Sequence, residues 1–218
     1  MITACNETVK GILAGRFMFR HEWYLRNMHS RGEVMGIMAT AYYTAEMVRN
    51  LPEDGNRYET VGGMLLVTPA PNAWHQELVE RIGDLVKGFA REMVDGHLFR
   101  SPADISWDED TLVQPDLFVV PREQARGWDW RNMKDLILVV EVLSPSSVSH
   151  DRYTKRRLYQ KVGVQEYWIV DPESETIEVW KPQDRFPTVY SESYEWCPMG
   201  SPGYLQVDLA QLFDRQLS

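Results

Sequence analysis

The segment Leu136–Ser147, LILVVEVLSPSS, contains the clearest strand signal of the sequence. Seven of the eight residues Leu136–Leu143 are apolar. A strand that is apolar on both faces is normally covered on both faces of a sheet. The exception is Glu141, and burying an unpaired carboxylate is costly enough that the group either becomes protonated or finds a partner. Glu141 therefore has two interpretations. It is a metal ligand or catalytic group, or it is a structural acid that forms a salt bridge or is neutral and hydrogen-bonded.

The elements around this strand predict a mixed α/β fold with one central sheet flanked by helices. A hairpin, a long helix, three strands, a second helix and two further strands are expected in this order. The hairpin turns at Gly62-Gly63, and a short helix capped by Thr44 precedes it. The expected ranges are hairpin Tyr58–Val61 and Met64–Thr68, helix Asn72–Met93, strands His97–Trp107, Asp116–Val120 and Leu136–Leu143, helix Val148–Val162, strands Glu166–Val170 and Thr176–Trp180, and a terminal helix near Leu209–Phe213.

Domain organisation follows from the same pattern. Residues 1–40 have no sustained amphipathic period, and we expect them to be a flexible arm or an extension upstream of a true start at Met35 or Met38. Residues 41–218 are expected to form a single domain, with a core over about residues 72–171. Beyond Lys181 the chain is expected to wrap the edge of the sheet, where it offers an interface for a homodimer.

Composition excludes several classes of protein. The chain has 218 residues with 23 Lys plus Arg against 32 Asp plus Glu, a net charge of −9. Proteins that bind nucleic acid over their whole surface are basic, so only a local basic patch is compatible with this charge. Cys5 and Cys197 form neither a CxxC site nor a framework of several disulfides. No apolar run reaches the roughly 18 to 20 residues of a membrane span. We expect a cytoplasmic protein without membrane association.

A second acid changes the interpretation of Glu141. Asp116 follows Pro115 at the start of another short apolar strand, PDLFVV. Two acids at neighbouring strand positions repel each other unless a cation lies between them. Carboxylate oxygens are the ligands that Mg²⁺ and Mn²⁺ prefer. The pair therefore predicts a divalent metal site.

The helix after Glu141 contributes an amine. Asp151, Lys155 and Tyr159 are spaced four apart and share one helix face. Lys155 can thus project toward Glu141, where an ammonium would orient a water molecule and stabilise charge on a phosphate. An exposed Asp151–Lys155 pair is the structural alternative, and by spacing alone it is the commoner case.

Four further cations lie on this helix: Arg152, Arg156, Arg157 and Lys161. Their concentration in an acidic protein predicts a surface that holds a phosphate backbone. A solvated basic face is the alternative.

Several ordered motifs resemble the Uma family of restriction-endonuclease-like proteins, a bacterial branch of the PD-(D/E)XK nuclease superfamily. The resemblance covers about Tyr43–Lys181. The motifs are LPEDGNRYETVGGMLLVTPAPNAWH, VQPDLFVV, LILVVEVLSPSS and DRYTKRRLYQKVGVQEYWIVDP. The family implies an αβββαβ nuclease core, in agreement with the order of elements above, and metal-dependent cleavage of phosphodiester bonds in DNA.

The resemblance also assigns residues. The family's metal-binding acids fall on Asp116 and Glu141, and the carbonyl of Val142 is a further candidate ligand. The superfamily's lysine position is occupied by Leu143, so Lys155 on the following helix becomes the candidate. Glu59 matches a family acid on the leading hairpin. His75 and Tyr159 are candidates for a supporting role, and an isolated histidine such as His75 is more often structural than a ligand.

The sequence thus predicts a Mg²⁺- or Mn²⁺-dependent endonuclease that acts on DNA, with RNA not excluded. The alternative is a catalytically silent module that keeps the nuclease fold for nucleic-acid binding or protein assembly. Leu143 and the acidic surface favour this alternative.

Overall fold

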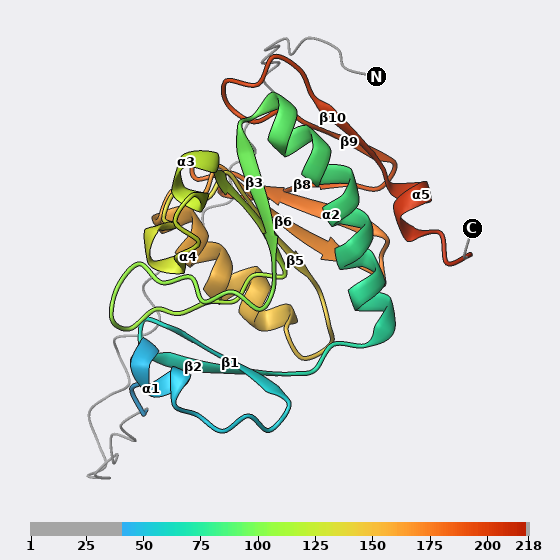
Figure 1. Ribbon diagram of the computed structural model, residues 1–218. Helices are drawn as coiled ribbons and strands as arrows, with labels where there is room; N and C mark the ends of the chain where they lie inside the picture. Colours follow the sequence, from blue (N-terminus) through green and yellow to red (C-terminus); the bar gives the residue numbers. More distant parts are fainter. Residues whose placement is uncertain (1–40, 217–218) are drawn as a thin grey trace, which may run out of the picture. The chain divides into compact units, whose positions relative to one another are not determined.

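The computed structural model describes residues 41–216, so the prediction for residues 1–40 lies outside the described residues. A six-stranded sheet with strand order β3-β4-β5-β6-β7-β8 forms the centre and carries helices on both faces (Figure 1). Its strands are β3 Gly96–Arg100, β4 Leu117–Pro121, β5 Leu138–Val142, β6 Glu166–Asp171, β7 Thr176–Trp180 and β8 Thr188–Tyr190. Two separate hairpins are β1 Asn56–Val61 with β2 Met64–Pro69, and β9 Ser193–Trp196 with β10 Leu205–Asp208.

The helices are short apart from one. The long helix α2 has Asn72 as its N-cap, whose side chain accepts a hydrogen bond from the amide of His75. The helical elements are α1 Ala45–Arg49, α2 Ala73–Met93, α3 Arg122–Ala125, the 3₁₀ turn η1 Trp130–Asn132, the π-helix η2 His150–Lys155, α4 Arg156–Lys161 and α5 Leu209–Phe213.

Strands β5 and β6 run parallel, and the crossover between them contains η2 and α4. The other neighbouring pairs of this sheet are antiparallel. The predicted α/β class and the predicted order of hairpin, helix, three strands, helix and two strands are confirmed. The parallel pair matters for function because its crossover brings η2 to the end of β5.

Successive side chains of β5 point into two different hydrophobic cores, one on each face of the sheet. Leu138, Val140 and Val142 face the core beneath α2, whereas Val139 faces the core beneath α4. Successive side chains of a strand point to opposite faces, so Glu141 points to the same face as Val139. The fold therefore directs the one acid of β5 toward the crossover that carries Lys155.

Most predicted bounds agree with the structure to within two residues, but three predicted segments differ from it in extent or in kind. The strand expected over His97–Trp107 ends at Arg100, and Pro102 follows, which has no amide hydrogen to donate to a neighbouring strand. The helix expected over Val148–Val162 is a π-helix followed by a short α-helix. The tail beyond Lys181 adds β8 to the sheet edge but also forms the β9–β10 hairpin, whose Trp196 is fully buried in the core beneath α2.

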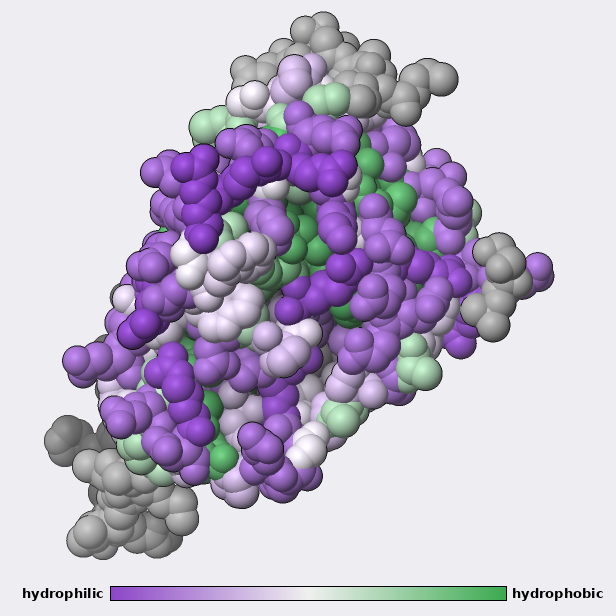
Figure 2. All heavy atoms as spheres, viewed as in Figure 1, coloured by the Kyte–Doolittle hydropathy of each residue, from purple (hydrophilic) through white to green (hydrophobic). Residues whose placement is uncertain are grey.

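The β1–β2 hairpin lies at the end of the sheet that carries the acids (Figure 1). Its turn, Gly62-Gly63, has φ of 57° and 78°, which is the left-handed geometry of the predicted two-residue turn. The face of the molecule in Figure 2 is mainly hydrophilic, with small hydrophobic areas between polar side chains. Among the described helices, none combines the length and apolar character that a membrane crossing needs.

Candidate active site

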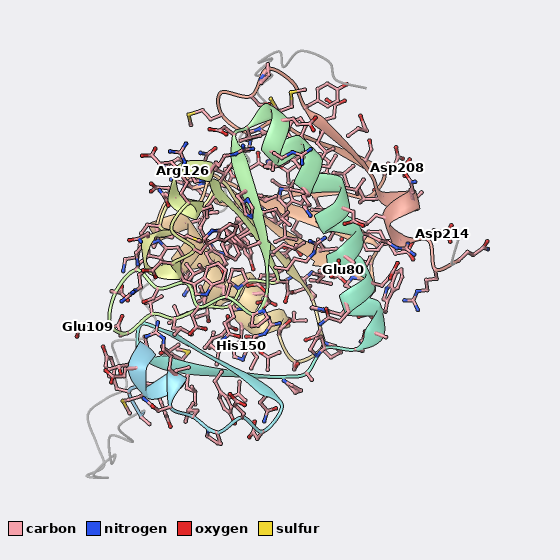
Figure 3. The ribbon with its side chains drawn as sticks, viewed as in Figure 1. Glu80, Glu109, Arg126, His150, Asp208 and Asp214 are labelled. Carbon is pink, nitrogen blue, oxygen red and sulfur yellow. The ribbon has the colours of Figure 1, made fainter. Side chains whose placement is uncertain are left out.

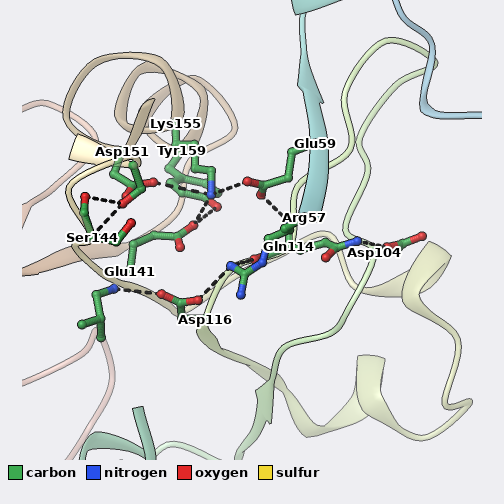
Figure 4. A network of polar contacts seen from close by, with 12 residues as sticks. Arg57, Glu59, Asp104, Gln114, Asp116, Glu141, Ser144, Asp151, Lys155 and Tyr159 are labelled. Atoms are coloured by element: carbon green, nitrogen blue, oxygen red, sulfur yellow. Dashed lines mark hydrogen bonds and ion pairs between the residues drawn. The ribbon is translucent and has the colours of Figure 1, made fainter. Parts of the chain in front are cut away.

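Asp116 and Glu141 lie next to each other at the ends of two paired strands. Leu117 of β4 pairs with Val140 of β5 in antiparallel register, so the next residues outward are Asp116 and Glu141. Opposite residues of an antiparallel pair project to the same face. The amide of Val142 donates to Asp116 Oδ2 at 3.0 Å, which ties the two strand ends together. Both acids are only 2% exposed, and Figure 4 shows their carboxylates in one network.

Asp116 has three donors. Arg57 Nη1 lies 2.8 Å from Oδ1, and His75 Nε2 lies 3.1 Å from Oδ2, which also accepts from Val142. Burial alone would raise the pKa of Asp116, but the hydrogen bond from His75 and the charge of Arg57 outweigh it and hold this pKa well below its usual range. Asp116 is therefore ionised at neutral pH.

Glu141 is in a different electrostatic state. Its Oε1 accepts from Lys155 Nζ at 3.0 Å and from the Tyr159 hydroxyl at 3.2 Å. Burial raises the pKa of Glu141 well above its usual value, and Asp151 and Asp116 add to this effect, while Lys155 opposes it. Without a further cation, this carboxyl group binds a proton more readily than Asp116 does.

Lys155 is the centre of an acidic cluster. Its Nζ lies 2.8 Å from Glu59, 3.0 Å from Glu141 and 3.5 Å from Asp151, and the residue is 3% exposed. Burial by itself would lower the pKa of Lys155, but the three carboxylates raise it well above its usual value. The interpretation of Asp151 and Lys155 as an exposed surface pair is wrong, because both side chains are buried.

Glu59 joins the hairpin to this cluster. It is 1% exposed; its Oε2 contacts Lys155, and its Oε1 accepts from the amide of Gln114 at 2.7 Å. A carboxylate on a two-stranded hairpin is usually solvated. Here both oxygens are engaged, so Glu59 fixes the position of the Lys155 ammonium relative to the sheet.

A small cavity connects these groups. Its lining includes Asp116, Glu141, Val142, Lys155 and His75, which are five of the candidate residues from the sequence. Asp151, the third acid in contact with Lys155, also lines the cavity. The cavity is therefore the place where a reacting group would contact the predicted residues.

The buried carboxylates suit a divalent cation, both in their net charge and in the oxygens that remain free to bind it. Four buried acids, Glu59, Asp116, Glu141 and Asp151, face two permanent cations, Arg57 and Lys155. Each carboxylate oxygen accepts about two hydrogen bonds. Among the described residues, Asp116 Oδ1 has one donor and Glu141 Oε2 has none. One oxygen on each strand end thus keeps a free position.

These two free oxygens are fewer ligands than a site that encloses a metal ion with protein groups alone would need. In the part of the chain that the structure describes, no three His, Cys, Asp or Glu side chains are grouped as metal ligands. Mg²⁺ commonly keeps several waters and binds proteins through one or two carboxylates together with substrate phosphates. The two free oxygens satisfy that lesser requirement.

Of the four cations that the sequence placed on the basic helix, Arg152 and Arg156 contact other protein groups. Arg152 is committed to Asp171 at 2.9 Å and Glu178 at 2.6 Å. Arg156 donates to Gln160 and lies 4.7 Å from the centre of the Trp180 ring.

The other two cations of this helix are exposed. Arg157 and Lys161 have no ion-pair partner among residues 41–216. Because they lie half a helix turn from Lys155 and Tyr159, they point away from the cavity.

Sequence reasoning missed two contributors. Arg57 was not selected, although it lies two residues before Glu59 and therefore projects from the same face of β1. Asp151 was considered only as the partner of Lys155. Asp151 is 1% exposed, and this burial comes from tertiary packing, which has no local signal in the sequence.

The fold and the site define a restriction-endonuclease-like class: a central mixed sheet with acids at the ends of two paired strands and a buried lysine beside them. The model of the Uma2 family, described as "Putative restriction endonuclease", matches residues 45–203. The chain therefore belongs to the Uma2 family, as its motifs predicted.

A solved structure supports the fold. The crystal structure described as a putative nuclease belonging to DUF820 from Anabaena variabilis ATCC 29413 superposes with a TM-score of 0.63. It shares 22% sequence identity with this chain, and the match covers 78% of this chain and 97% of the other. No curated protein matches the chain.

Proposed function

We propose that this protein is a divalent-metal-dependent endonuclease that hydrolyses phosphodiester bonds in DNA. The observation that carries the proposal is the meeting of Asp116 and Glu141 at paired strand ends with the buried Lys155 ammonium 3.0 Å from Glu141. This arrangement supplies two ligand oxygens and one fixed cation, which are the groups that phosphoryl hydrolysis needs.

The cation would be Mg²⁺ or Mn²⁺, held by Asp116 and Glu141, with the carbonyl of Val142 as a further ligand. When bound, it would neutralise phosphate charge and make a water molecule more acidic. Lys155 stays protonated because three carboxylates raise its pKa. It therefore acts as a hydrogen-bond donor that orients the attacking water and stabilises charge on the phosphate, rather than as a base.

The remaining residues hold this arrangement in place. His75 donates a hydrogen bond to Asp116, and Tyr159 donates one to Glu141. Each bond fixes the orientation of one carboxylate. Glu59 and Asp151 restrain the Lys155 ammonium. Arg157 and Lys161 would attract the phosphate backbone over a longer range. Cytoplasmic location and a homodimer remain predictions.

Nicking of a supercoiled plasmid in Mg²⁺, Mn²⁺ or EDTA tests the proposal. Asp116→Asn and Glu141→Gln keep shape but remove ligand charge, and both should abolish metal-dependent nicking. Glu109→Gln, on an exposed loop (Figure 3), is the matched acid control and should nick like the wild type. Incubation of the protein with labelled DNA and RNA strands of equal sequence shows which of the two nucleic acids is cleaved. Nicking that survives in both site variants would contradict the proposal.

The second candidate function is a nuclease-fold module without catalysis. It is favoured by Leu143, which occupies the position of the superfamily's lysine and is buried in the core beneath α4. Calorimetric titration with Mn²⁺ separates the candidates. Binding that disappears in Asp116→Asn supports the enzyme, whereas DNA retention without metal binding supports the module.

A further inference from the structure

Arg57 lies between two hollows of the surface. It lines the cavity of the acids, and it also lines an adjoining groove that extends past α2 toward Arg100 and Gln114. His75 and Asp116 are likewise shared by the two. A ligand that extends from the groove into the cavity must therefore pass Arg57.

The guanidinium of Arg57 is held by one edge only. Its Nη1 donates to Asp116 Oδ1 at 2.8 Å and to the carbonyl of Gln114 at 3.1 Å. No described residue accepts from Nε or Nη2, and the side chain is 20% exposed. The close-up in Figure 4 shows the same arrangement, with interactions on one terminal nitrogen. The contacts fix the position of the group but leave donors available.

Arg57 pairs with one acid, Asp116, and no described residue accepts from its Nε or Nη2. Arg100, the other arginine of the groove, is paired with Glu80 at 3.3 Å and with Asp84 at 3.2 Å. Glu53 and Glu80 line the groove as well, so its charge is mixed. Such a groove does not attract a polyanion along its whole length. It favours a single phosphate contact at Arg57.

The chemistry of the free edge specifies the ligand. A guanidinium presents donors in a planar fork that matches two oxygens of a phosphate. A phosphate that enters the cavity beside Asp116 also reaches this fork, because Arg57 Nη1 is in direct contact with Asp116. We infer that Arg57 binds the phosphate at which the substrate strand is cut, in addition to orienting Asp116. The inference rests on the proposed function for the identity of this phosphate.

The test measures DNA binding in EDTA, where no metal-dependent cleavage proceeds. The probe is a fluorescein-labelled oligonucleotide, single- or double-stranded, titrated at several salt concentrations. Each phosphate contact contributes about 0.9 to the slope of log affinity against log salt for duplex DNA and about 0.7 for single strands. Arg57→Gln should lower the slope by about one contact, and Arg57→Lys should keep it. Arg126→Gln, an exposed arginine near α3 (Figure 3), is the control without effect.

A second readout separates substrate binding from a structural role. If Arg57 only held Asp116 in place, Arg57→Gln would weaken Mn²⁺ binding together with activity. If Arg57 also binds phosphate, cleavage by the variant falls even at Mn²⁺ concentrations that saturate its metal site. The fall should be about 10²-fold or more, the usual cost of one preorganised donor. Should Arg57→Gln not fold, phenylglyoxal labelling of the wild type decides, because the oligonucleotide should protect Arg57 but not Arg126.

The outcomes are distinguishable from those of the proposed function. An unchanged salt slope, or no protection of Arg57, overturns the inference even if Asp116→Asn and Glu141→Gln abolish nicking. A lowered slope in a protein that never nicks DNA supports the phosphate contact and refutes the endonuclease.

Discussion

Lys155 Nζ lies 3.0 Å from Glu141 Oε1, although 14 residues separate the two along the chain. Glu141 is on β5, and Lys155 is the last residue of the π-helix in the crossover that follows. Leu143, at the position where the superfamily usually has its lysine, is instead buried in the core beneath α4. The ammonium thus reaches the acid from a different element, and this geometry makes Lys155 the most informative position to alter.

Lys155→Met should destabilise the protein by about 3–5 kcal/mol, the usual cost of breaking a buried ion pair from one side. The change leaves Glu59, Glu141 and Asp151 together without their shared cation. Urea unfolding at neutral pH measures the loss. Added Mn²⁺ should stabilise the variant more than the wild type, because a bound cation replaces the missing charge.

Lys161→Met is the matched control, since Lys161 is exposed on the adjoining α4. Its unfolding free energy should change by less than about 0.5 kcal/mol. Equal losses in the two variants would show that the buried contacts of Lys155 do not contribute as the structure indicates.

Much of the fold was predictable because its signals are local. The strand Thr176–Trp180 and the terminal helix Leu209–Phe213 have the predicted bounds. The long helix begins one residue after the predicted start, because Asn72 is its cap. In each case alternation, helical period or a capping residue is contained within the segment itself.

The site was predictable only in part, because it combines distant segments. The spacing of Lys155 and Tyr159 indicated a shared helix face, and both side chains do contact Glu141. The contact of Arg57 with Asp116 spans 59 residues and depends on how the hairpin packs against the sheet. The commitment of Arg152 to Asp171 and Glu178 likewise follows from strand register, which the sequence does not display.

Tyr159→Phe should lower both stability and cleavage. The hydroxyl donates to Glu141 Oε1 at 3.2 Å in a buried position. Removing one partner of a buried hydrogen bond costs about 1–3 kcal/mol. Glu141 also becomes freer to rotate away from its position beside Asp116. Urea unfolding and plasmid nicking measure the two effects.

Tyr153→Phe provides the comparison, because Tyr153 lies on η2 but is 59% exposed. It should match the wild type in both assays. A Tyr159→Phe protein with unaltered stability and nicking would remove Tyr159 from the site.

The double variant Arg157→Gln/Lys161→Gln should weaken DNA binding without changing the rate of cleavage at saturating DNA. Both side chains are exposed and point away from the cavity, so they contribute long-range attraction only. The slope of log affinity against log salt should fall by up to about two phosphate contacts. Arg152→Gln should leave this slope unchanged but destabilise the protein, since Arg152 holds Asp171 and Glu178. An altered slope in Arg152→Gln alone would reverse this assignment.

His97 should make the protein less stable as the pH falls below about 6.5. Burial lowers the pKa of His97 from 6.5, and the charges of Arg122 and Lys87 lower it further. Its ring lies 4.5 Å from that of Phe99 and 5.5 Å from that of Trp128. Because the folded pKa is the lower one, the unfolded chain binds the proton more tightly. The contribution of His97 is therefore complete above the unfolded pKa and is lost as the pH falls through the folded one.

Proton NMR titration of His97 measures this pKa directly, and urea unfolding at about pH 7.5 and about pH 5.5 measures its effect on stability. His97→Gln should lose less stability between these two conditions than the wild type. Trp128→Ala should raise the pKa of His97 toward 6.5, because Trp128 covers part of its ring. Arg122→Gln should also raise it, by a smaller amount, since burial is the larger cause. A wild-type His97 that titrates at or above 6.5 would contradict the packing of this aromatic cluster.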